Sequence, residues 1–174
     1  MVRRIVTGLV GVIAATSGLA QPAGVVIRET PLVGSAGTPI GTVIASGSAN
    51  ATVLRILVAP GGLTPGWHGV HLHAVGDCSD PGQFLRSRGP VDHLIKSHGL
   101  LHPAGPKEGD LPNIYANPDG SANAEMLSHA VRMLGQTGLV EGDGSALVIH
   151  AQEDDHLSQP LGNTGNRVAC AAFR

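Results

Sequence analysis

The sequence predicts an all-β fold, an antiparallel sandwich or flattened barrel. Glycine and proline are frequent and scattered, with 25 and 12 copies among 174 residues. Short runs of Val, Ile, Leu and Ala are separated by turn residues, and short strands at such spacing are typical of antiparallel sandwiches and barrels. Because glycines and prolines interrupt nearly every stretch long enough for a helix, we expect little helix.

The first strands are expected before the middle of the chain. Apolar runs bounded by turn residues predict strands at residues 25–28, 40–44, 51–58 and 67–75. The last two are separated by the breaker at 60–66, which is rich in Gly and Pro.

Two long loops are expected in the rest of the chain. Residues 76–113 show little alternation and many Gly, Pro, Asp, Ser and His residues. Strands are predicted again at 123–133, 146–150 and 167–173, with a second polar loop at 151–166. Loops of this length in a compact domain are usually functional.

The N-terminal segment has the form of a secretory signal peptide. Arg3 and Arg4 precede an apolar run at 5–15, followed by small residues ahead of a cleavage site. The run is short for a membrane span; the alternative is an uncleaved anchor. We therefore predict a signal peptide at 1–20 and one domain at 21–174, exported to the periplasm or secreted, with no membrane association after cleavage.

Charge and cysteine content narrow the function classes. The net charge is −2, and loss of Arg3 and Arg4 would make it more negative, so nothing favours nucleic-acid binding.

Cys78 and Cys170 are the two cysteines. In an oxidising compartment such a pair predicts a disulfide, worth roughly 4 to 5 kcal/mol for a loop of this length. The alternative is two free thiols.

Three histidines suggest a transition-metal site. His71 and His73 are two residues apart in a predicted strand, so both imidazoles project to the same face. His150 lies in another predicted strand. Three neutral imidazoles could converge on one copper ion, although a lone His-x-His is also common on the surface of a strand.

Four segments in order resemble the copper,zinc superoxide dismutases. Residues 69–78 are similar to the copper-binding strand, 98–112 to the zinc loop, 144–150 to the strand with the last copper histidine, and 162–170 to the C-terminal signature. The resemblance covers residues 40–174. It implies a Greek-key, Ig-like β-sandwich or flattened barrel with two long functional loops and one disulfide.

The resemblance also implies roles for individual residues. Arg167 would attract superoxide and hold it near copper, and Asp154 would link the copper and zinc histidines as a second-layer carboxylate. The remaining matches are the copper ligands His71, His73 and His150, the zinc ligands His98 and Asp110, and the disulfide cysteines Cys78 and Cys170.

The chain departs from the family pattern at two zinc-side positions. Pro90 stands where the family has the histidine that bridges both metals, and Lys107 stands where it has another zinc histidine. Neither residue can ligate, so we expect no tight zinc and a Lys107–Asp110 ion pair in its place; a solvated lysine is the alternative. His93 or His102 could substitute as a ligand, and with a shifted loop His93 could take the bridging place.

The resemblance predicts dismutation of superoxide anion to oxygen and hydrogen peroxide at a copper centre, with zinc doubtful and activity reduced by Pro90. The alternative is a non-catalytic copper-binding or structural protein of the same fold. The sequence leaves the oligomeric state open, a homodimer included.

Overall fold

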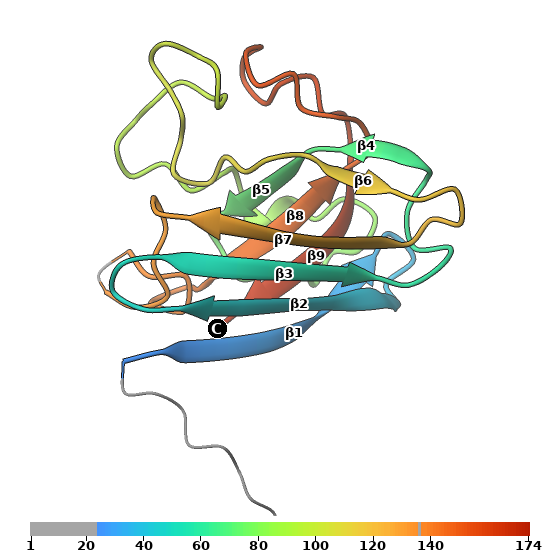
Figure 1. Cartoon of the computed structure of the whole chain (residues 1–174), viewed down its shortest axis with the longest axis horizontal. Helices are drawn as coiled ribbons and strands as arrows, with labels where there is room; N and C mark the ends of the chain where they lie inside the picture. Colours follow the sequence, from blue (N-terminus) through green and yellow to red (C-terminus); the bar gives the residue numbers. More distant parts are fainter. Residues whose placement is uncertain (1–23, 136) are drawn as a thin grey trace, which may run out of the picture.

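Nearly all regular structure in the computed structural model is β-strand (Figure 1). The structure describes residues 24–135 and 137–174, so the predicted signal peptide at 1–20 lies outside the described part. Within that part no helix is long and apolar enough to cross a membrane.

The strands pair antiparallel throughout. Seven form one curled sheet in the order β5-β8-β9-β1-β2-β3-β7, and β4 pairs with β6. The elements are β1 (Val26–Gly34), β2 (Pro39–Gly47), β3 (Thr52–Val58), β4 (Gly66–His68), β5 (Val70–His73), a short 3-10 helix η1 (Leu85–Ser87), β6 (Ile114–Ala116), β7 (Ala122–Ser128), β8 (Ser145–His150) and β9 (Arg167–Phe173).

The sheet curls into a flattened barrel. Only Gly69 separates β4 from β5, so the β4–β6 pair continues the sheet beyond β5 and returns it towards β7, as Figure 1 shows. The predicted all-β class is confirmed. The disulfide between Cys78 and Cys170 is also present and ties the long loop after β5 to β9.

Alternation along each strand builds the core. In β3, Leu54 and Ile56 are fully buried, whereas Arg55 between them is exposed and pairs with Glu125 of β7 at 2.6 Å. Residues two apart share a face of the sheet, so one face of β3 supplies the core and the other carries a cross-strand ion pair.

The strand β8 is buried along its whole length. It lies between β5 and β9, with Leu147 and Ile149 in the main core. Its other face, at Val148, packs with Phe84 and Cys170 in a second apolar cluster. The loop after β5 therefore covers the outer surface of the barrel at this point.

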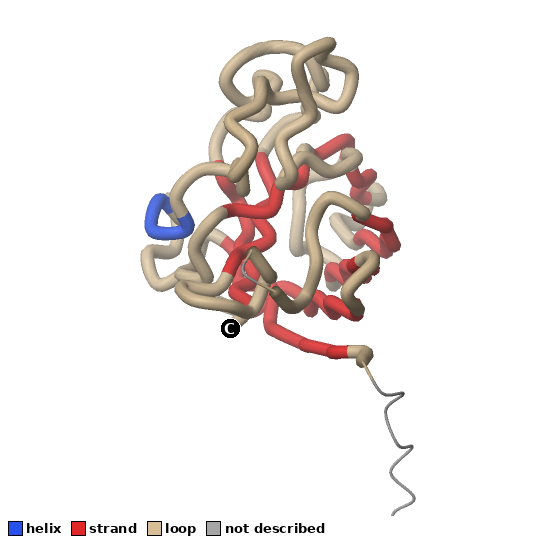
Figure 2. The backbone as a smooth tube through the Cα atoms, turned by 90° about the vertical axis from the view of Figure 1, so that its left-hand side faces the viewer, coloured by secondary structure: helices blue, strands red, loops and turns tan. Residues whose placement is uncertain are grey.

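Some predicted boundaries are wrong. The strand expected at 123–133 ends at Ser128, and the one expected at 67–75 is divided at Gly69. The strand β6 and the helix η1 were not predicted; each has only three residues. The two long loops are present, and they meet at one end of the barrel, where the N–H of Leu101 donates to the carbonyl of His156 at 3.1 Å. Figure 1 shows them by colour at this end, yellow-green and orange-red, and Figure 2 shows the same end made of loops.

Candidate metal centre

The strand alternation of β5 places two histidines outside the core. Val70 and Leu72 belong to the main apolar cluster, so His71 and His73 face the opposite side, where the loops cover them. His150 ends the neighbouring strand β8 at a register shift. The exposed fraction of all three histidines is 1% or less, and each offers one nitrogen within 4.8 Å of the others.

One nitrogen of each imidazole is engaged by an oxygen of the protein. His71 Nε2 lies 2.7 Å from Asp154 Oδ2. His73 Nδ1 lies 2.6 Å from the carbonyl oxygen of Arg88. His150 Nδ1 lies 3.1 Å from the hydroxyl of Thr164. Such contacts fix ring orientation and tautomer, as they commonly do for metal-ligating histidines.

The other nitrogen of each ring has no protein oxygen to bind. His71 Nδ1 and His150 Nε2 face each other at 3.2 Å. His73 Nε2 is buried with no hydrogen-bond partner in the described part of the chain. Buried polar atoms are seldom left unpaired, and imidazole nitrogens are good ligands for copper. The three-histidine set therefore fits a copper ion.

The charge state of two of these rings also suits a metal. Burial lowers the pKa of His73 well below its usual value, and the positive charge of Arg167 lowers it further. Burial, followed by the neighbouring His71, lowers the pKa of His150 to about 3. Both rings are neutral near pH 7, so each keeps a lone pair available for a cation.

Arg167 lies close to the three-histidine cluster. Its guanidinium donates hydrogen bonds to the carbonyl of Phe84 and, at 3.2 Å, to the hydroxyl of Ser87. Its charge is close enough to lower the pKa of both His73 and His150. The side chain lines a surface hollow of about 350 Å³ together with Gly82, Gln83, Leu85, Gly165 and Asn166. A small anion that enters this hollow meets a fixed positive charge.

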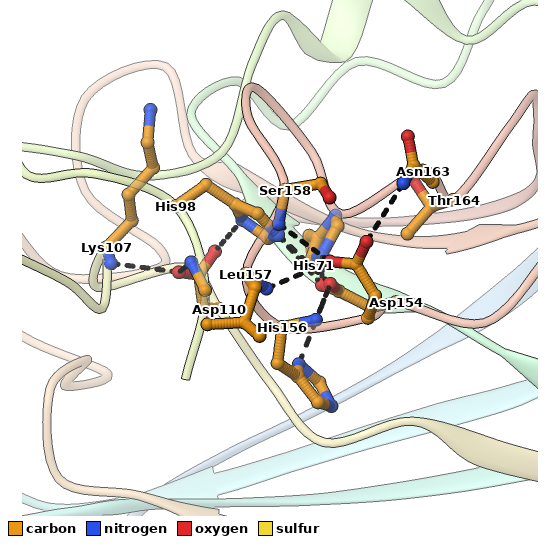
Figure 3. Close-up of polar contacts among 12 residues, drawn as sticks. His71, His98, Lys107, Asp110, Asp154, His156, Leu157, Ser158, Asn163 and Thr164 are labelled. Atoms are coloured by element: carbon orange, nitrogen blue, oxygen red, sulfur yellow. Dashed lines mark hydrogen bonds and ion pairs between the residues drawn. The ribbon is translucent and has the colours of Figure 1, made fainter. Parts of the chain in front are cut away.

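A second buried cluster adjoins the first. His98 Nδ1 lies 2.8 Å from Asp110 Oδ1, and His98 Nε2 lies 3.1 Å from Asp154 Oδ1 (Figure 3). Burial opposes the positive charge on His98, but its bonds to the two carboxylates outweigh that and raise its pKa to about 9. The pKa values of Asp110 and Asp154 are lowered in turn, because bonds from His98 and its neighbours outweigh their burial.

Gly162 allows this second cluster to close. Its φ is +61°, and a Cβ at this position would overlap the carboxylate of Asp154 and crowd His98 Nε2. Only glycine combines a left-handed backbone with so close an approach at low cost. The loop after β8 therefore presses its backbone directly onto the Asp154–His98 contact.

The zinc ligands expected from the family pattern are incomplete. Pro90 lies directly across from His73 as an isolated β-bridge partner, and it has no side-chain donor. The expected ion pair between Lys107 and Asp110 is not formed. Lys107 Nζ lies 3.1 Å from Asp92 Oδ2 instead, and only the backbone N–H of Lys107 binds Asp110 (Figure 3). Within the described residues the possible metal-binding sets are His71, His73 and His150, and His71, His98 and Asp154. Asp110 belongs to neither set, so the residues present do not complete the zinc site of the family pattern.

The two spare histidines are not brought to the cluster. His93 is half exposed at the side chain and faces Glu108, with Nδ1 3.4 Å from Oε1. His102 Nδ1 accepts a hydrogen bond from the backbone of Ala104. Neither belongs to a possible metal-binding set in the described part of the structure. The register of Pro90 opposite His73 also argues against the shifted-loop alternative.

Several supporting residues had no sequence signal strong enough to find them. His68 is buried, and its two nitrogens lie 2.6 Å from the carbonyl oxygen of His150 and 2.8 Å from that of Thr64. Arg88 contributes only a carbonyl to the site. Because these contacts use backbone atoms, residue type alone could not reveal them; the nearness of His68 to the His-x-His pair was the one available hint.

Comparison with known proteins agrees with this geometry. The family model described as copper/zinc superoxide dismutase matches residues 40–173. The chain belongs to the copper/zinc superoxide dismutase family. It is 41% identical over 143 residues to the Cu-Zn superoxide dismutase of Caulobacter vibrioides, covering 79% of this chain and 80% of that protein.

Solved structures of the copper/zinc superoxide dismutase family share the fold. A superoxide dismutase-like protein from Bacillus subtilis superposes with a TM-score of 0.77 at 30% identity, covering 84% of this chain and 97% of that one. A variant of that protein has histidine in place of a proline and gives the same TM-score and identity. The Cu/Zn superoxide dismutase of Brucella abortus has a TM-score of 0.68 at 25% identity, covering 85% and 99% of the two chains.

Proposed function

We propose that this chain dismutes superoxide at a single copper ion held by His71, His73 and His150, without zinc. The observation that carries the proposal is the set of three buried imidazole nitrogens that no protein oxygen engages. Membership of the superoxide dismutase family supports the reaction, and the donor set supports the metal.

Copper, when bound, supplies one-electron exchange, so that two superoxide anions and two protons yield oxygen and hydrogen peroxide. The chain supplies the surroundings. Arg167 attracts the anion into the hollow and holds it by charge and hydrogen bonds. Asp154 fixes the ring of His71 through Nε2, which keeps Nδ1 directed to the metal side.

Proton delivery to the reacting oxygen is the step for which this chain lacks a residue of the family pattern. The family pattern provides a bridging imidazole, whereas Pro90 occupies the place across from His73 and has no side-chain donor. We propose that the protons come instead from water that reaches the hollow beside Arg167. We therefore expect turnover slower than that of a dismutase with a complete site.

Export from the cytoplasm is part of the proposal. The disulfide between Cys78 and Cys170 favours an oxidising compartment, and the relatives include bacterial copper/zinc dismutases. Expression of the full chain in a Gram-negative host, followed by cell fractionation and N-terminal sequencing, would test it. Protein retained in the cytoplasm with an intact N-terminus would contradict export.

The decisive experiment is superoxide consumption by purified, copper-loaded protein. We expect activity in the wild type and a loss of at least 100-fold in His150→Ala. The exposed His129 provides a matched control, since His129→Ala removes a histidine away from the cluster and should leave the rate unchanged. Equal rates for wild type and His150→Ala would refute the copper site.

A second candidate function is copper binding without turnover. Pro90 favours it, because it removes a donor beside His73. In the Bacillus subtilis relative a proline-to-histidine variant has been crystallised. Stoichiometric copper with no superoxide consumption would support this candidate. Pro90→His should then raise the rate; no gain would show that Pro90 is not the limiting defect.

A further inference from the structure

We propose that a metal-free brace of protein groups takes the place of zinc, closes the loop between β5 and β6 and orients His71. The brace runs from the Asp92–Lys107 ion pair through Asp110, His98 and Asp154 to His71. It rests on the absence of zinc proposed above, and it does not depend on copper turnover.

The base of the loop is closed by backbone hydrogen bonds around Leu72. The N–H of Val91 donates to the carbonyl of Leu72 at 2.8 Å, and the N–H of Leu72 donates to the carbonyl of Gly109 at 2.8 Å. The N–H of Gly109 donates back to Val91 at 2.9 Å. Leu72 lies between His71 and His73, so the loop closes directly on the candidate copper strand.

The Asp92–Lys107 ion pair lies just inside this closure. The two side chains are 3.1 Å apart, with exposed fractions of 21% for Lys107 and 19% for Asp92. Asp92 Oδ1 also accepts the N–H of Lys96 at 2.8 Å. A partly buried ion pair of this kind joins the two arms of the loop without a metal, and it uses the lysine that replaces a family zinc ligand.

Asp110 has its acceptor sites filled by the protein. Oδ2 accepts the backbone N–H of Gly99 at 2.8 Å and that of Lys107 at 2.9 Å. Oδ1 faces His98 Nδ1 at 2.8 Å. A carboxylate held by two backbone N–H groups and an imidazole is satisfied within the loop, so it does not require a cation.

His98 is likewise satisfied at both nitrogens. Nδ1 faces Asp110 and Nε2 faces Asp154, so each nitrogen already has a carboxylate partner within the protein. Asp154 Oδ2 then reaches His71 Nε2 at 2.7 Å. The brace thus restricts the orientation of His71, one of the three candidate copper ligands.

Zinc content and thermal unfolding of the copper-loaded protein test the brace. We expect less than about 0.2 zinc per chain after dialysis against excess zinc, and a midpoint that moves by less than 1 °C. The measurement is repeated on His73→Ala/His150→Ala, so that zinc entering the copper site is recognised and a failed copper site does not obscure the result. About one retained zinc per chain, lost in His98→Ala, would overturn the proposal.

The ion pair itself is tested by Lys107→Ala. Removing one partly buried partner should lower the unfolding midpoint by about 2 to 4 °C for a chain of this size. Lys96→Ala is the matched control: it removes a lysine of the same loop that bonds Asp92 through its backbone only. Equal midpoints for the two variants would contradict a bracing role for Lys107.

Discussion

The two buried histidine clusters use the same residue types but differ in their hydrogen bonding. In the three-histidine cluster, one nitrogen of each imidazole contacts an oxygen of the protein and the other nitrogen contacts none. In the cluster around His98, both nitrogens and the facing carboxylates are engaged. The difference between the clusters is therefore that the three-histidine cluster leaves imidazole nitrogens without a protein oxygen, whereas the polar groups around His98 are paired with one another.

His71 is the residue at which the two clusters meet. Its Nδ1 lies in the three-histidine set, and its Nε2 binds the carboxylate that also binds His98. Substitution of His71 should therefore remove a candidate copper ligand and also a hydrogen-bond partner of Asp154, two effects that other substitutions produce separately.

The largest expected effect comes from His71→Ala compared with His73→Ala. Both should abolish copper-dependent superoxide consumption, by at least 100-fold. His71→Ala also leaves the buried Asp154 without one of its hydrogen-bond partners, and a hydrogen bond to a charged group contributes about 1.5 to 3 kcal/mol. Its unfolding midpoint in the metal-free protein should therefore fall several degrees below that of His73→Ala.

Scanning calorimetry of metal-free wild type, His71→Ala and His73→Ala measures the three unfolding midpoints. Equal midpoints for His71→Ala and His73→Ala would show that the second cluster does not support the first. Circular dichroism at room temperature checks that both variants fold before their metal content is compared.

The sequence named the members of both clusters through the family resemblance, but it did not predict how the loop residues around them would be arranged. The remaining members of both clusters were named from the resemblance, but the shared face of His71 and His73 follows from strand alternation alone. The arrangement of Lys107 does not: a loop lysine has many accessible rotamers, and nothing local favoured Asp92 over Asp110. Likewise Gly162 and the carbonyl of Arg88 act through backbone geometry, which residue type leaves undetermined.

Strand ends were harder to predict than strand positions. Val131 and Met133 are buried and extended the apolar pattern beyond Ser128, where β7 ends. The three-residue strand β6 is too short for alternation to identify, and it pairs with β4, which falls at the start of the strand predicted at 67–75.

A smaller effect is expected from Gly162→Ala compared with Gly142→Ala. Both glycines have a positive φ, +61° and +56°, but only Gly162 would place a Cβ against Asp154. Gly142 has nothing within 4 Å, so it measures the backbone cost alone. We expect Gly162→Ala to be less stable than Gly142→Ala by about 1 to 3 kcal/mol, the usual cost of overpacking.

Chemical denaturation gives the two stabilities directly. If Gly162→Ala and Gly142→Ala lost the same free energy, the close contact over Asp154 would be unimportant. Copper content of Gly162→Ala adds a second reading, since displacement of Asp154 should also weaken the orientation of His71.

The subtlest difference between the clusters is the sign of their pH dependence in the metal-free protein. The pKa of His98 is raised to about 9 by its carboxylate partners, so its stabilisation is complete below about pH 6.5 and is lost as pH rises towards 9. The pKa of His150 is lowered to about 3, mainly by burial, so stability due to this neutral ring is complete above about pH 6.5 and falls as pH drops below it.

His98→Gln separates the two contributions. The free energy of unfolding of wild type minus that of His98→Gln should decrease between pH 6.5 and 9, with a slope of at most about 1.4 kcal/mol per pH unit for one proton. Urea denaturation across this range, with chelator present, measures the difference. His150→Gln should instead change the curve below pH 6.5. If the difference in unfolding free energy between wild type and His98→Gln did not change with pH, the bonds of His98 to Asp110 and Asp154 would not raise its pKa. The two clusters would then not differ in their electrostatics.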